Sequence, residues 1–397
     1  MGKATKFVDI FGHNEIGPVE NPFPTFRRLR QEEPVILLKG AAYYAHMVTR
    51  FDDCIEILKD DKRYSNRSNS RGIGLVMGKT IVEMDGPEHT KHRNLVTPSL
   101  APRALRGDFM ANVDKIANEI IDDFAGQGEV DLVKEFTFNY PLRVFTTILG
   151  LPAEDVKFVH ETAAALATIG VDPAAGFAAS AKLKEYLAPL VKGRRDNPED
   201  DLLSKLCTSE VNGEHLTDEE IISFVCLLVL AGAETTYHLL GSALYGLLTN
   251  QKQLAEVRDN SDLVVPALDE TLRWESPVGL VSRLCEEDVK IGDYEIAKGE
   301  AVILALGSAN RDENKFDDPD QFNIHRGAEA LKEHRAFGLG KHFCAGSRLA
   351  YAEAKVGLEV LLKRLPNLRF QDGEEEKSMV VGLAFRGPNQ LPVQFDA

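Results

Sequence analysis

The sequence predicts a mainly helical fold with a minor β component, in a single large domain built around a long central helix. Apolar residues recur mostly at helical spacing between about Pro87 and Asn250. Residues 216–250 are apolar on nearly every face of a helix, which is typical of a helix that runs through the centre of a protein. Alternating runs typical of strands lie near the start of the chain and within 288–306. No internal repeat or low-complexity linker divides the 397 residues, so one domain over 1–397 is favoured.

The first part of the chain, to about residue 85, contains strands, and the remainder is rich in helices. Residues 163–181 are rich in Ala and Gly, which fits either an ordinary helix or a mobile lid. The last long helix begins at Gly346 and stops before Pro366, because proline cannot continue a helix. The other expected elements are, in order, a helix at 24–33, strands within 34–40 and 41–50, helices at 51–61, 111–128 and 176–201, and strands within 288–306.

The composition is that of a globular protein and argues against several classes. The formal charge of −16 argues against a general affinity for nucleic acid or an anionic membrane. The five cysteines are far apart and include no CxxC pair, which argues against a disulfide framework or a four-cysteine zinc site. The N-terminal stretch has no apolar signal core, and the longest apolar run, 221–233, ends at Glu234. We therefore expect a cytoplasmic protein without a membrane anchor.

The central helix carries groups that its core position disfavours. Thr217 and Glu220 have capping-box spacing at its start. Gly232, Glu234 and Thr235 then interrupt the apolar run. A glycine in a helix interior costs about 1 kcal/mol relative to alanine, and a buried carboxylate costs more unless it is paired.

These groups have two interpretations. The first is a helix end or a kink with exposed side chains. Because apolar helical spacing continues for several turns, the second is favoured: a local opening of the helix. Gly232 would then admit something flat against the backbone, and Thr235 would hydrogen-bond a carbonyl of the helix. An acid beside a hydroxyl, Glu234 and Thr235, also suits a proton relay.

A cysteine loop, FGLGKHFCAG, spans residues 337–346. Its glycines Gly338, Gly340 and Gly346 indicate backbone conformations that side chains forbid, folded tightly against something planar or bulky. Cys344 immediately precedes the last long helix, whose N-terminal dipole and free N–H groups stabilise a thiolate. A thiolate held in this way, backed by a phenyl ring, suits axial ligation of haem iron.

Two other roles for Cys344 compete with ligation. A cysteine nucleophile needs a base, and His342 is close in sequence, but residues two apart in a tight loop rarely face each other. A buried structural cysteine is the commonest fate of a lone Cys, but it leaves the glycines unexplained.

Glu270 and Arg273 lie three residues apart on one face of a helix that ends before Pro277. Exposed pairs at this spacing are common and contribute only about 0.2–0.5 kcal/mol. Its position in the sequence, between the central helix and the cysteine loop, favours a more specific role for this pair.

Together these motifs resemble the cytochrome P450 family of haem-thiolate monooxygenases. The pair Glu270 and Arg273 matches the family's ExxR motif, and the stretches NPFPTFRRLRQEEPV, MDGPEHTKHRNLVTPSL and SANRDENKFDDPDQFNIHR extend the resemblance over nearly the whole chain. The central helix matches AGxET at Ala231, Gly232, Glu234 and Thr235. The cysteine loop matches FGxGxHxCxG at Phe337, Gly338, Gly340, His342, Cys344 and Gly346.

The resemblance implies the cytochrome P450 fold, haem b as the cofactor and dioxygen as a co-substrate. Cys344 would be the axial ligand of the haem iron, and Glu234 and Thr235 would deliver protons for dioxygen activation. The haem propionates would be held by His89, Arg93, Arg283 and His342. Other haem contacts would come from Ala231, Gly232, Phe337, Gly338 and Gly346. A buried structural network would join Glu270, Arg273 and Arg326.

The resemblance also implies the substrate class and the partners. The substrate would be a hydrophobic small molecule, such as a terpenoid, steroid, fatty acid or aromatic compound. No reductase domain follows Ala397, so we expect electrons from NAD(P)H through a ferredoxin reductase and a ferredoxin that meets Lys91, Lys341 and Arg348, and a monomeric enzyme. The pocket walls would be Leu230, Ala233, Val278, Leu280, Val281, Leu383, Phe385 and part of the 67–82 loop.

Two residues depart from the common pattern of the family. Glu313 stands where proline is frequent, and Tyr351 stands where arginine often follows Leu-Ala. Neither position carries chemistry, so the departures bear on local packing or on the partner surface.

Two alternative functions remain at this point. A peroxide-driven peroxygenase is the first, and the pair Glu234 and Thr235 argues against it because that route needs no proton relay. A non-catalytic haem sensor or carrier is the second, and it would need neither the relay nor an apolar substrate cavity.

Overall fold

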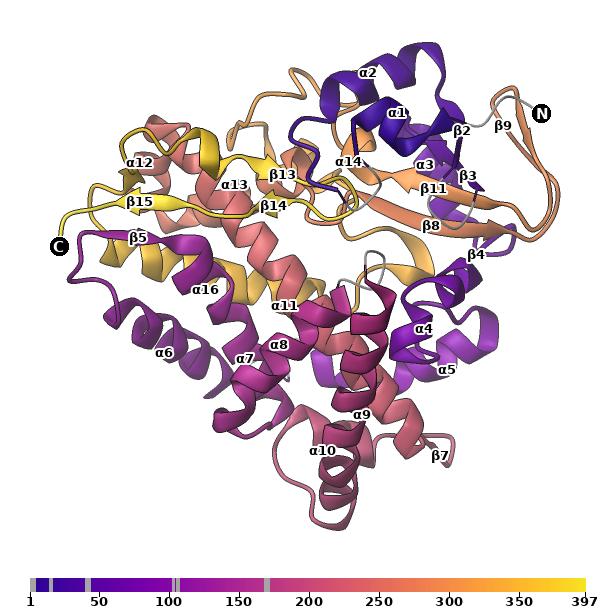
Figure 1. Ribbon diagram of the computed structural model, residues 1–397, viewed down its shortest axis with the longest axis horizontal. Coiled ribbons are helices and arrows are strands. Elements are labelled where there is room, and N and C mark those ends of the chain that lie inside the picture. The colour runs from indigo at the N-terminus through magenta and orange to yellow at the C-terminus, as the bar shows by residue number, and fades with distance from the viewer. Residues whose placement is uncertain (1–4, 14–16, 40–43, 102–103, 105–107, 168–171) are drawn as a thin grey trace.

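The helices of the computed structural model surround one long helix, and the largest of its small sheets lies at one end (Figure 1). The structure describes residues 5–13, 17–39, 44–101, 104, 108–167 and 172–397. Its helices are α1 (Phe7–Phe11), α2 (Phe23–Glu32), α3 (Phe51–Lys59), α4 (Gly74–Met77), α5 (Gly86–Val96), α6 (Asp108–Asp122), α7 (Asn139–Leu149), α8 (Val156–Ala167), α9 (Pro173–Asp196), α10 (Leu202–Thr208), α11 (Asp218–Leu248), α12 (Gln251–Asp259), α13 (Val264–Trp274), α14 (Leu306–Ala309), α15 (Ala328–Lys332) and α16 (Ser347–Arg364). The prediction of a mainly helical fold with small sheets is confirmed.

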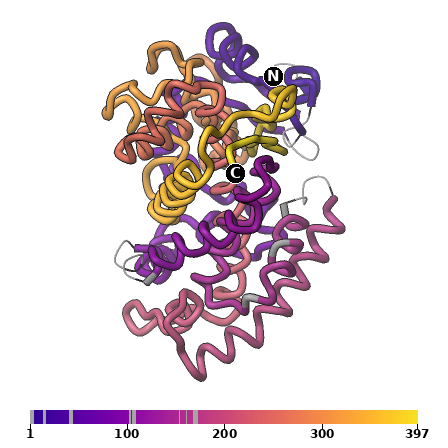
Figure 2. The backbone as a smooth tube through the Cα atoms, turned by 90° about the vertical axis from the view of Figure 1, so that its left-hand side faces the viewer, coloured from indigo at the N-terminus to yellow at the C-terminus, as the bar shows by residue number. Residues whose placement is uncertain are grey.

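The strands are short. They are β1 (Thr5–Lys6), β2 (Val35–Lys39), β3 (Tyr44–Val48), β4 (Tyr64–Ser65), β5 (Glu129–Asp131), β6 (Glu210–Val211), β7 (Glu214–His215), β8 (Leu280–Cys285), β9 (Val289–Ile291), β10 (Tyr294–Ile296), β11 (Ala301–Ala305), β12 (Arg369–Phe370), β13 (Val380–Val381), β14 (Gly387–Pro388) and β15 (Pro392–Gln394). The largest sheet has the order β1-β2-β3-β11-β8-β4, so β3 pairs with β11 about 250 residues further along the chain. This sheet and α1 and α2 lie at one end of the molecule, and α8, α9 and α10 lie at the other (Figures 1 and 2).

The central helix α11 is buried along much of its length, as predicted. Its capping box is present, because Oγ1 of Thr217 accepts from the Glu220 N–H and Glu220 accepts from the Thr217 N–H. The helix contacts α7, α9, α13 and α16. By length and composition it is the one helix in the described ranges that could cross a membrane, but its most apolar window is mostly buried inside the protein. It is therefore the core helix of this fold.

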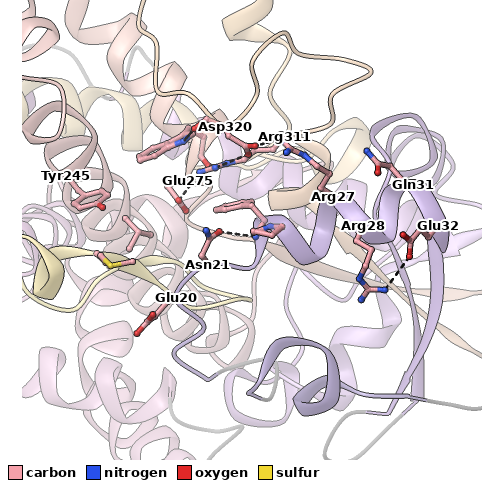
Figure 3. A pocket seen from close by; sticks show the side chains of 15 residues that line it. Glu20, Asn21, Arg27, Arg28, Gln31, Glu32, Tyr245, Glu275, Arg311 and Asp320 are labelled. Carbon is pink, nitrogen blue, oxygen red and sulfur yellow. Dashed lines mark hydrogen bonds and ion pairs between the residues drawn. The ribbon is translucent and has the colours of Figure 1, made fainter.

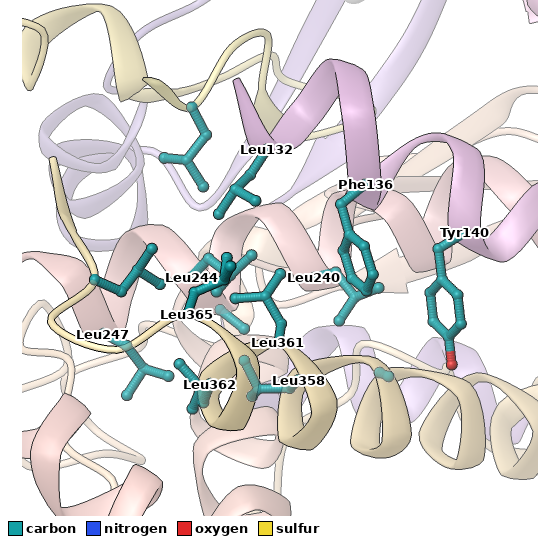
Figure 4. Packing of buried hydrophobic residues seen from close by; sticks show 14 of the residues in the cluster. Leu132, Phe136, Tyr140, Leu240, Leu244, Leu247, Leu358, Leu361, Leu362 and Leu365 are labelled. Atoms are coloured by element: carbon teal, nitrogen blue, oxygen red, sulfur yellow. The ribbon is translucent and has the colours of Figure 1, made fainter. Parts of the chain in front are cut away.

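The packing of α16 on α11 fixes the cysteine loop relative to the central helix. Leu358, Leu361 and Leu362 of α16 lie against leucines of α11 in the largest apolar cluster (Figure 4). Tyr140 of α7 closes this cluster, and its hydroxyl donates to the carbonyl of Glu353 on α16 at 3.0 Å. Since the cysteine loop leads directly into α16, its residues are held against α11.

Three expected elements differ in detail. Within 111–128 the helix ends at Asp122, before its glycines, and a turn follows. The strands within 288–306 are a separate hairpin, β9–β10, and one strand of the main sheet, β11. Of residues 163–181, the described parts form the end of α8 and the start of α9, and 168–171 lie outside the described residues.

Candidate functional site

One cavity joins the cysteine loop to the polar part of α11. It encloses about 590 Å³, and both Cys344 and the pair Glu234 and Thr235 line it. The predicted haem contacts that also line it are Arg93, Ala231, Gly232, Arg283, Phe337, Gly338, His342 and Gly346. His89 is not among the lining residues. Segments that lie far apart in the sequence therefore meet in a single mostly apolar space.

Cys344 lies just before the N-terminus of α16, as predicted, and its backbone N–H donates to the carbonyl of Phe337 at 2.9 Å. The backbone N–H groups of Gly346 and Ser347 and the Arg93 cation favour the thiolate, but burial outweighs them and raises the pKa of the Cys344 thiol. The predicted stabilisation of the thiolate by helix N–H groups is therefore present, but its effect on the pKa is smaller than that of burial. A bound metal cation would supply the missing stabilisation.

The glycines of the cysteine loop have different roles. Gly338 and Gly340 have φ of 71° and 73°, in the left-handed region, as predicted. Gly346 has φ of −88°, so the expectation of a forbidden conformation is wrong for this residue. A Cβ on Gly346 would meet nothing within 4 Å, so its missing side chain leaves open space at the cavity wall.

Replacing Gly340 with alanine is expected to destabilise the loop. A left-handed alanine costs about 1–2 kcal/mol, and the added Cβ would also lie 2.8 Å from the backbone oxygen of Leu58. Gly299 is a matched control, because it has φ of 85° and its Cβ would meet nothing within 4 Å. Urea denaturation should show a larger loss for Gly340→Ala than for Gly299→Ala. Equal losses would mean that the contact with Leu58 relaxes without cost.

His342 does not serve Cys344 as a base. Its Nε2 lies 3.2 Å from Oδ1 of Asp85, and its ring lies against that of His89, with centroids 4.1 Å apart. Burial, followed by the nearby His342 and Arg93, lowers the pKa of His89 to about 4. Nε2 of His89 is buried without a hydrogen-bond partner among the described residues. The nucleophile interpretation of Cys344 therefore loses its base.

Two arginines leave positive charge in the cavity wall. Arg93 donates to the carbonyl of Phe343 at 2.6 Å, and Arg283 donates to the carbonyl of Ser282 at 2.8 Å. In the described part of the chain, neither guanidinium has a carboxylate within 4.0 Å. Burial lowers the pKa of Arg283 to about 10. Buried cations without a counter-charge are costly, so the wall is suited to an anionic ligand group.

These residues fit a haem. A cysteine beside two helix N–H groups offers a thiolate ligand, the two uncompensated arginines offer partners for two propionates, and Gly346 leaves space at the wall. The apolar remainder of the cavity suits a porphyrin ring.

The polar stretch of α11 continues as helix, so the predicted opening is absent. Oγ1 of Thr235 donates to the carbonyl of Ala231 at 2.7 Å, which is the expected carbonyl bond. A Cβ on Gly232 would lie 3.0 Å from the ring of Phe145, so the flat group that Gly232 admits on that side is a phenyl ring of α7. The Glu234 side chain is 22% exposed, and burial raises its pKa to about 7.

Most predicted pocket walls line the cavity. Leu230, Val278, Leu280, Val281 and Phe385 do so, together with Asn69, Ile73, Ile81 and Val82 of the 67–82 loop. Ala233 and Leu383 do not, so these two predictions are wrong. Ala233 packs on the apolar cluster behind α11, and Leu383 is buried in the cluster beneath α1 and α2. Ala233 lies on the face of α11 turned away from the lining residues. Leu383 lies in a bend between β13 and β14, and the residues after it, Ala384 and Phe385, line the cavity instead.

Sequence reasoning missed other walls on α11. Phe224, Leu227 and Leu228 share one face with the predicted residues Ala231 and Glu234, at steps of three or four residues. This helical spacing from Glu234 was the available signal. Leu100 and Phe145 came from elements that no local pattern linked to the site.

The structure brings Glu270, Arg273 and Arg326 together. Arg273 donates to both oxygens of Glu270 at 2.8 Å, and Nε of Arg326 lies 2.9 Å from Oε1 of Glu270. The side chains of Glu270 and Arg273 are 0% exposed. The remaining donors of Arg273 reach the carbonyls of Asn310, Pro319 and Gln321. The network therefore ties α13 to the segment that precedes the cysteine loop.

A second buried network was not predicted. Glu275 accepts from Arg311 at 2.9 Å and from Arg386 at 2.7 Å. Glu275 and Arg311 border a separate hollow of about 550 Å³ beside α2 (Figure 3). The arginines of this hollow, Arg27, Arg28 and Arg311, are paired with carboxylates that line it. Because these charges are compensated, the hollow lacks the uncompensated cations of the main cavity.

The two departures from the family pattern make their own contacts. Glu313 accepts from Arg30 of α2 at 2.5 and 3.0 Å. The Tyr351 hydroxyl donates to Asp269 and lies 3.3 Å from Nε2 of His334. Both therefore serve local packing.

The comparisons with known proteins agree with this geometry. The sequence model of the family described as Cytochrome P450 matches residues 174–386. The polyketide biosynthesis cytochrome P450 PksS of Bacillus subtilis is 33% identical over 390 residues, covering 94% of this chain and 95% of that protein. Its solved structure has a TM-score of 0.86, with 32% identity and coverage of 95% and 97%.

Two other solved structures carry ligands or partners. CYP109E1 from Bacillus megaterium in complex with testosterone has a TM-score of 0.83 and 29% identity, covering 95% of this chain and 100% of that chain. P450BioI in complex with an acyl carrier protein ligated to hexadec-9Z-enoic acid has a TM-score of 0.85 and 30% identity, with coverage of 95% and 98%. The cysteine loop, the cavity and these similarities lead to one assignment: the chain belongs to the cytochrome P450 family of haem monooxygenases, oxidoreductases that act on small molecules.

Proposed function

We propose that this enzyme hydroxylates a hydrophobic small molecule with dioxygen, using electrons that a ferredoxin and its reductase deliver from NAD(P)H. The observation that carries the proposal is the single cavity that Cys344, Glu234 and Thr235 line together. It combines a ligand for haem iron, a source of protons and apolar walls.

The cavity lining supports an apolar substrate. Leucine, isoleucine, valine and phenylalanine side chains from α11, β8 and the 67–82 loop dominate its walls. CYP109E1 holds testosterone, and P450BioI meets a fatty acyl chain on a carrier protein, at similar folds. A steroid or a medium to long acyl chain is therefore the substrate class to test first.

The residues of this chain divide the chemical work. A bound haem supplies the redox chemistry that activates dioxygen. Cys344 would hold the iron, and Arg93 and Arg283 would hold the propionates by charge-assisted hydrogen bonds. Because burial raises its pKa to about 7, Glu234 can both hold and release a proton near neutral pH. Thr235, fixed by its bond to Ala231, presents its hydroxyl oxygen as the next acceptor.

Ferredoxin docking is proposed on the face that carries the cysteine loop. Arg348 of α16 is exposed there, while Lys91 and Lys341 are engaged with Glu214 at 2.8 Å and Asp61 at 2.6 Å. Arg348 is therefore the more available of the three cations for an acidic partner.

The proposed role of Thr235 in proton supply predicts that its replacement uncouples electron use from product formation. Thr235→Ala should keep haem but lower product formed per NAD(P)H at least about tenfold, because positioned proton transfer contributes about 10²–10⁴-fold. Thr147→Ala is the matched control, since its hydroxyl makes the same bond to the carbonyl of Arg143 at 2.8 Å and Thr147 lies at an exposed position of α7. Equal coupling in wild type and Thr235→Ala would remove the role of Thr235.

The raised pKa of Glu234 predicts that product formed per NAD(P)H depends on pH near neutrality. Burial favours the neutral acid, so the proton is present below about pH 7 and is lost as the pH rises through that value. Product per NAD(P)H should fall above pH 7 in the wild type and should be low at every pH in Glu234→Gln. A wild-type profile that is flat from pH 6 to 8 would contradict the role.

The direct test of the proposed function is turnover of a steroid or a fatty acid. Product should form with ferredoxin, reductase and NAD(P)H and should need dioxygen. Product formed with hydrogen peroxide alone, and not with the electron-transfer proteins, would indicate a peroxygenase instead. Spectral binding of ligand without product by either route would indicate a haem sensor or carrier.

A further inference from the structure

A buried histidine lies one turn beyond Glu234 on α11. Nε2 of His238 is 3.9 Å from Oε1 of Glu234, and the histidine side chain is 8% exposed. That separation exceeds a hydrogen bond, so a rotation of the Glu234 side chain is needed to close it. Glu234 borders the cavity and His238 does not, so the rotation carries the carboxylate away from the cavity.

The surroundings of the His238 ring select one tautomer. Among the described residues, Nδ1 has no hydrogen-bond partner. It lies against Gly387 of β14, where a Cβ would come within 1.9 Å of it. A proton on Nδ1 would be buried without an acceptor, which is unfavourable. Because Nε2 faces Glu234, the tautomer with its proton on Nε2 is the one in which the neutral ring can donate to that carboxylate.

The ring also stays neutral. Burial, followed by the cation of Arg386, lowers the pKa of His238 to about 3. Burial holds Glu353 and Tyr237 in their neutral forms by raising their pKa values. The Tyr237 ring of α11 lies beside the His238 ring, with centroids 3.9 Å apart, and Arg386, just before β14, is the cation that acts on it. His238 is therefore a fixed donor toward Glu234 and not a proton carrier.

We propose that His238 is a positioning residue that receives the ionised carboxylate of Glu234 through its Nε2–H group and holds it away from Thr235 until the carboxylate regains a proton. The inference rests on the proposed function, in which Glu234 supplies protons to the cavity. No covalent bond changes in this step: one N–H···O hydrogen bond forms when the carboxylate turns. Glu234 thus has two positions, one toward the cavity when neutral and one toward His238 when ionised.

The test is an infrared pH titration of the Glu234 carboxyl group in the haem-loaded protein without substrate or redox partners. The carboxylic acid band is assigned by its absence in Glu234→Gln. A donor that favours the charged form lowers the pKa of an acid, so His238→Leu should move the midpoint upward by about one pH unit, a tenfold change in proton affinity. His238→Gln keeps an N–H group and should return the midpoint toward the wild-type value.

His325→Leu is the control, because His325 is 54% exposed and its partner is Glu256, outside the cavity. It should leave the midpoint unchanged. The proposal is overturned if His238→Leu titrates like the wild type, or if His238→Gln shifts as far as His238→Leu. Because the titration requires no turnover, failure of monooxygenase activity and failure of this inference are separate results.

Discussion

Replacement of Glu270 by glutamine is expected to lower the free energy of unfolding by about 3–5 kcal/mol, because removal of one partner leaves buried charges uncompensated. Among the residues that the structure describes, Glu270 is the one carboxylate that pairs with both Arg273 and Arg326, and its side chain is fully buried. Glutamine keeps the shape but supplies no negative charge. It also presents an N–H₂ group, which would face arginine donors on at least one side.

The measurement is the urea midpoint of the haem-loaded protein, with Glu32→Gln as control. Glu32 pairs with Arg28 at 3.8 Å, but both side chains are more than half exposed, so its loss should cost at most about 0.5 kcal/mol. Similar midpoints for Glu270→Gln and Glu32→Gln would contradict the structural role of the network. The expected decrease in the free energy of unfolding is large. A low yield of folded Glu270→Gln protein would therefore also agree with the prediction.

Replacement of Cys344 by serine is expected to abolish monooxygenase activity while leaving the chain folded. A hydroxyl is a far weaker donor to iron than a thiolate, and it does not push electron density toward O–O cleavage. Cys344 is partly exposed to the cavity, so the change removes little packing. Product formation should fall by at least about 10²-fold, because O–O cleavage would lose the electron density that a thiolate supplies.

Cys207→Ser provides the matched control. Sγ of Cys207 lies 3.7 Å from the carbonyl of Val191, and a serine hydroxyl can keep that acceptor. Its activity should stay near that of the wild type. Activity in Cys344→Ser equal to that in Cys207→Ser would remove Cys344 from the reaction.

Features encoded by local spacing were predictable from the sequence. The capping box at Thr217, the turn of helix that joins Glu270 to Arg273, and the left-handed glycines Gly338 and Gly340 all depend on neighbours within a few residues. The bond from Thr235 to the carbonyl four residues earlier is of the same kind. In each case the pattern itself determines the contact.

Features that depend on tertiary packing were harder to predict. No local pattern indicates that Gly232 faces Phe145, because the two residues lie almost ninety positions apart in the chain. Strand β8, which holds Arg283 in the cavity wall, is defined by its pairing with β11 and not by a clear alternation of its own. The bond from Arg386 to Glu275 spans 111 residues. Gly346 was misread because a glycine can be required by open space beside it as well as by φ.

The most direct test of the account is the absorption spectrum of the reduced, carbon-monoxide-bound protein. If Cys344 is the axial ligand, the wild-type Soret band lies at the long wavelength typical of thiolate-ligated haem. In Cys344→Ser the band should move to the shorter wavelength typical of neutral ligands. A wild-type band already at the shorter wavelength, or one that stays in place in Cys344→Ser, would contradict the central claim that Cys344 binds the haem iron.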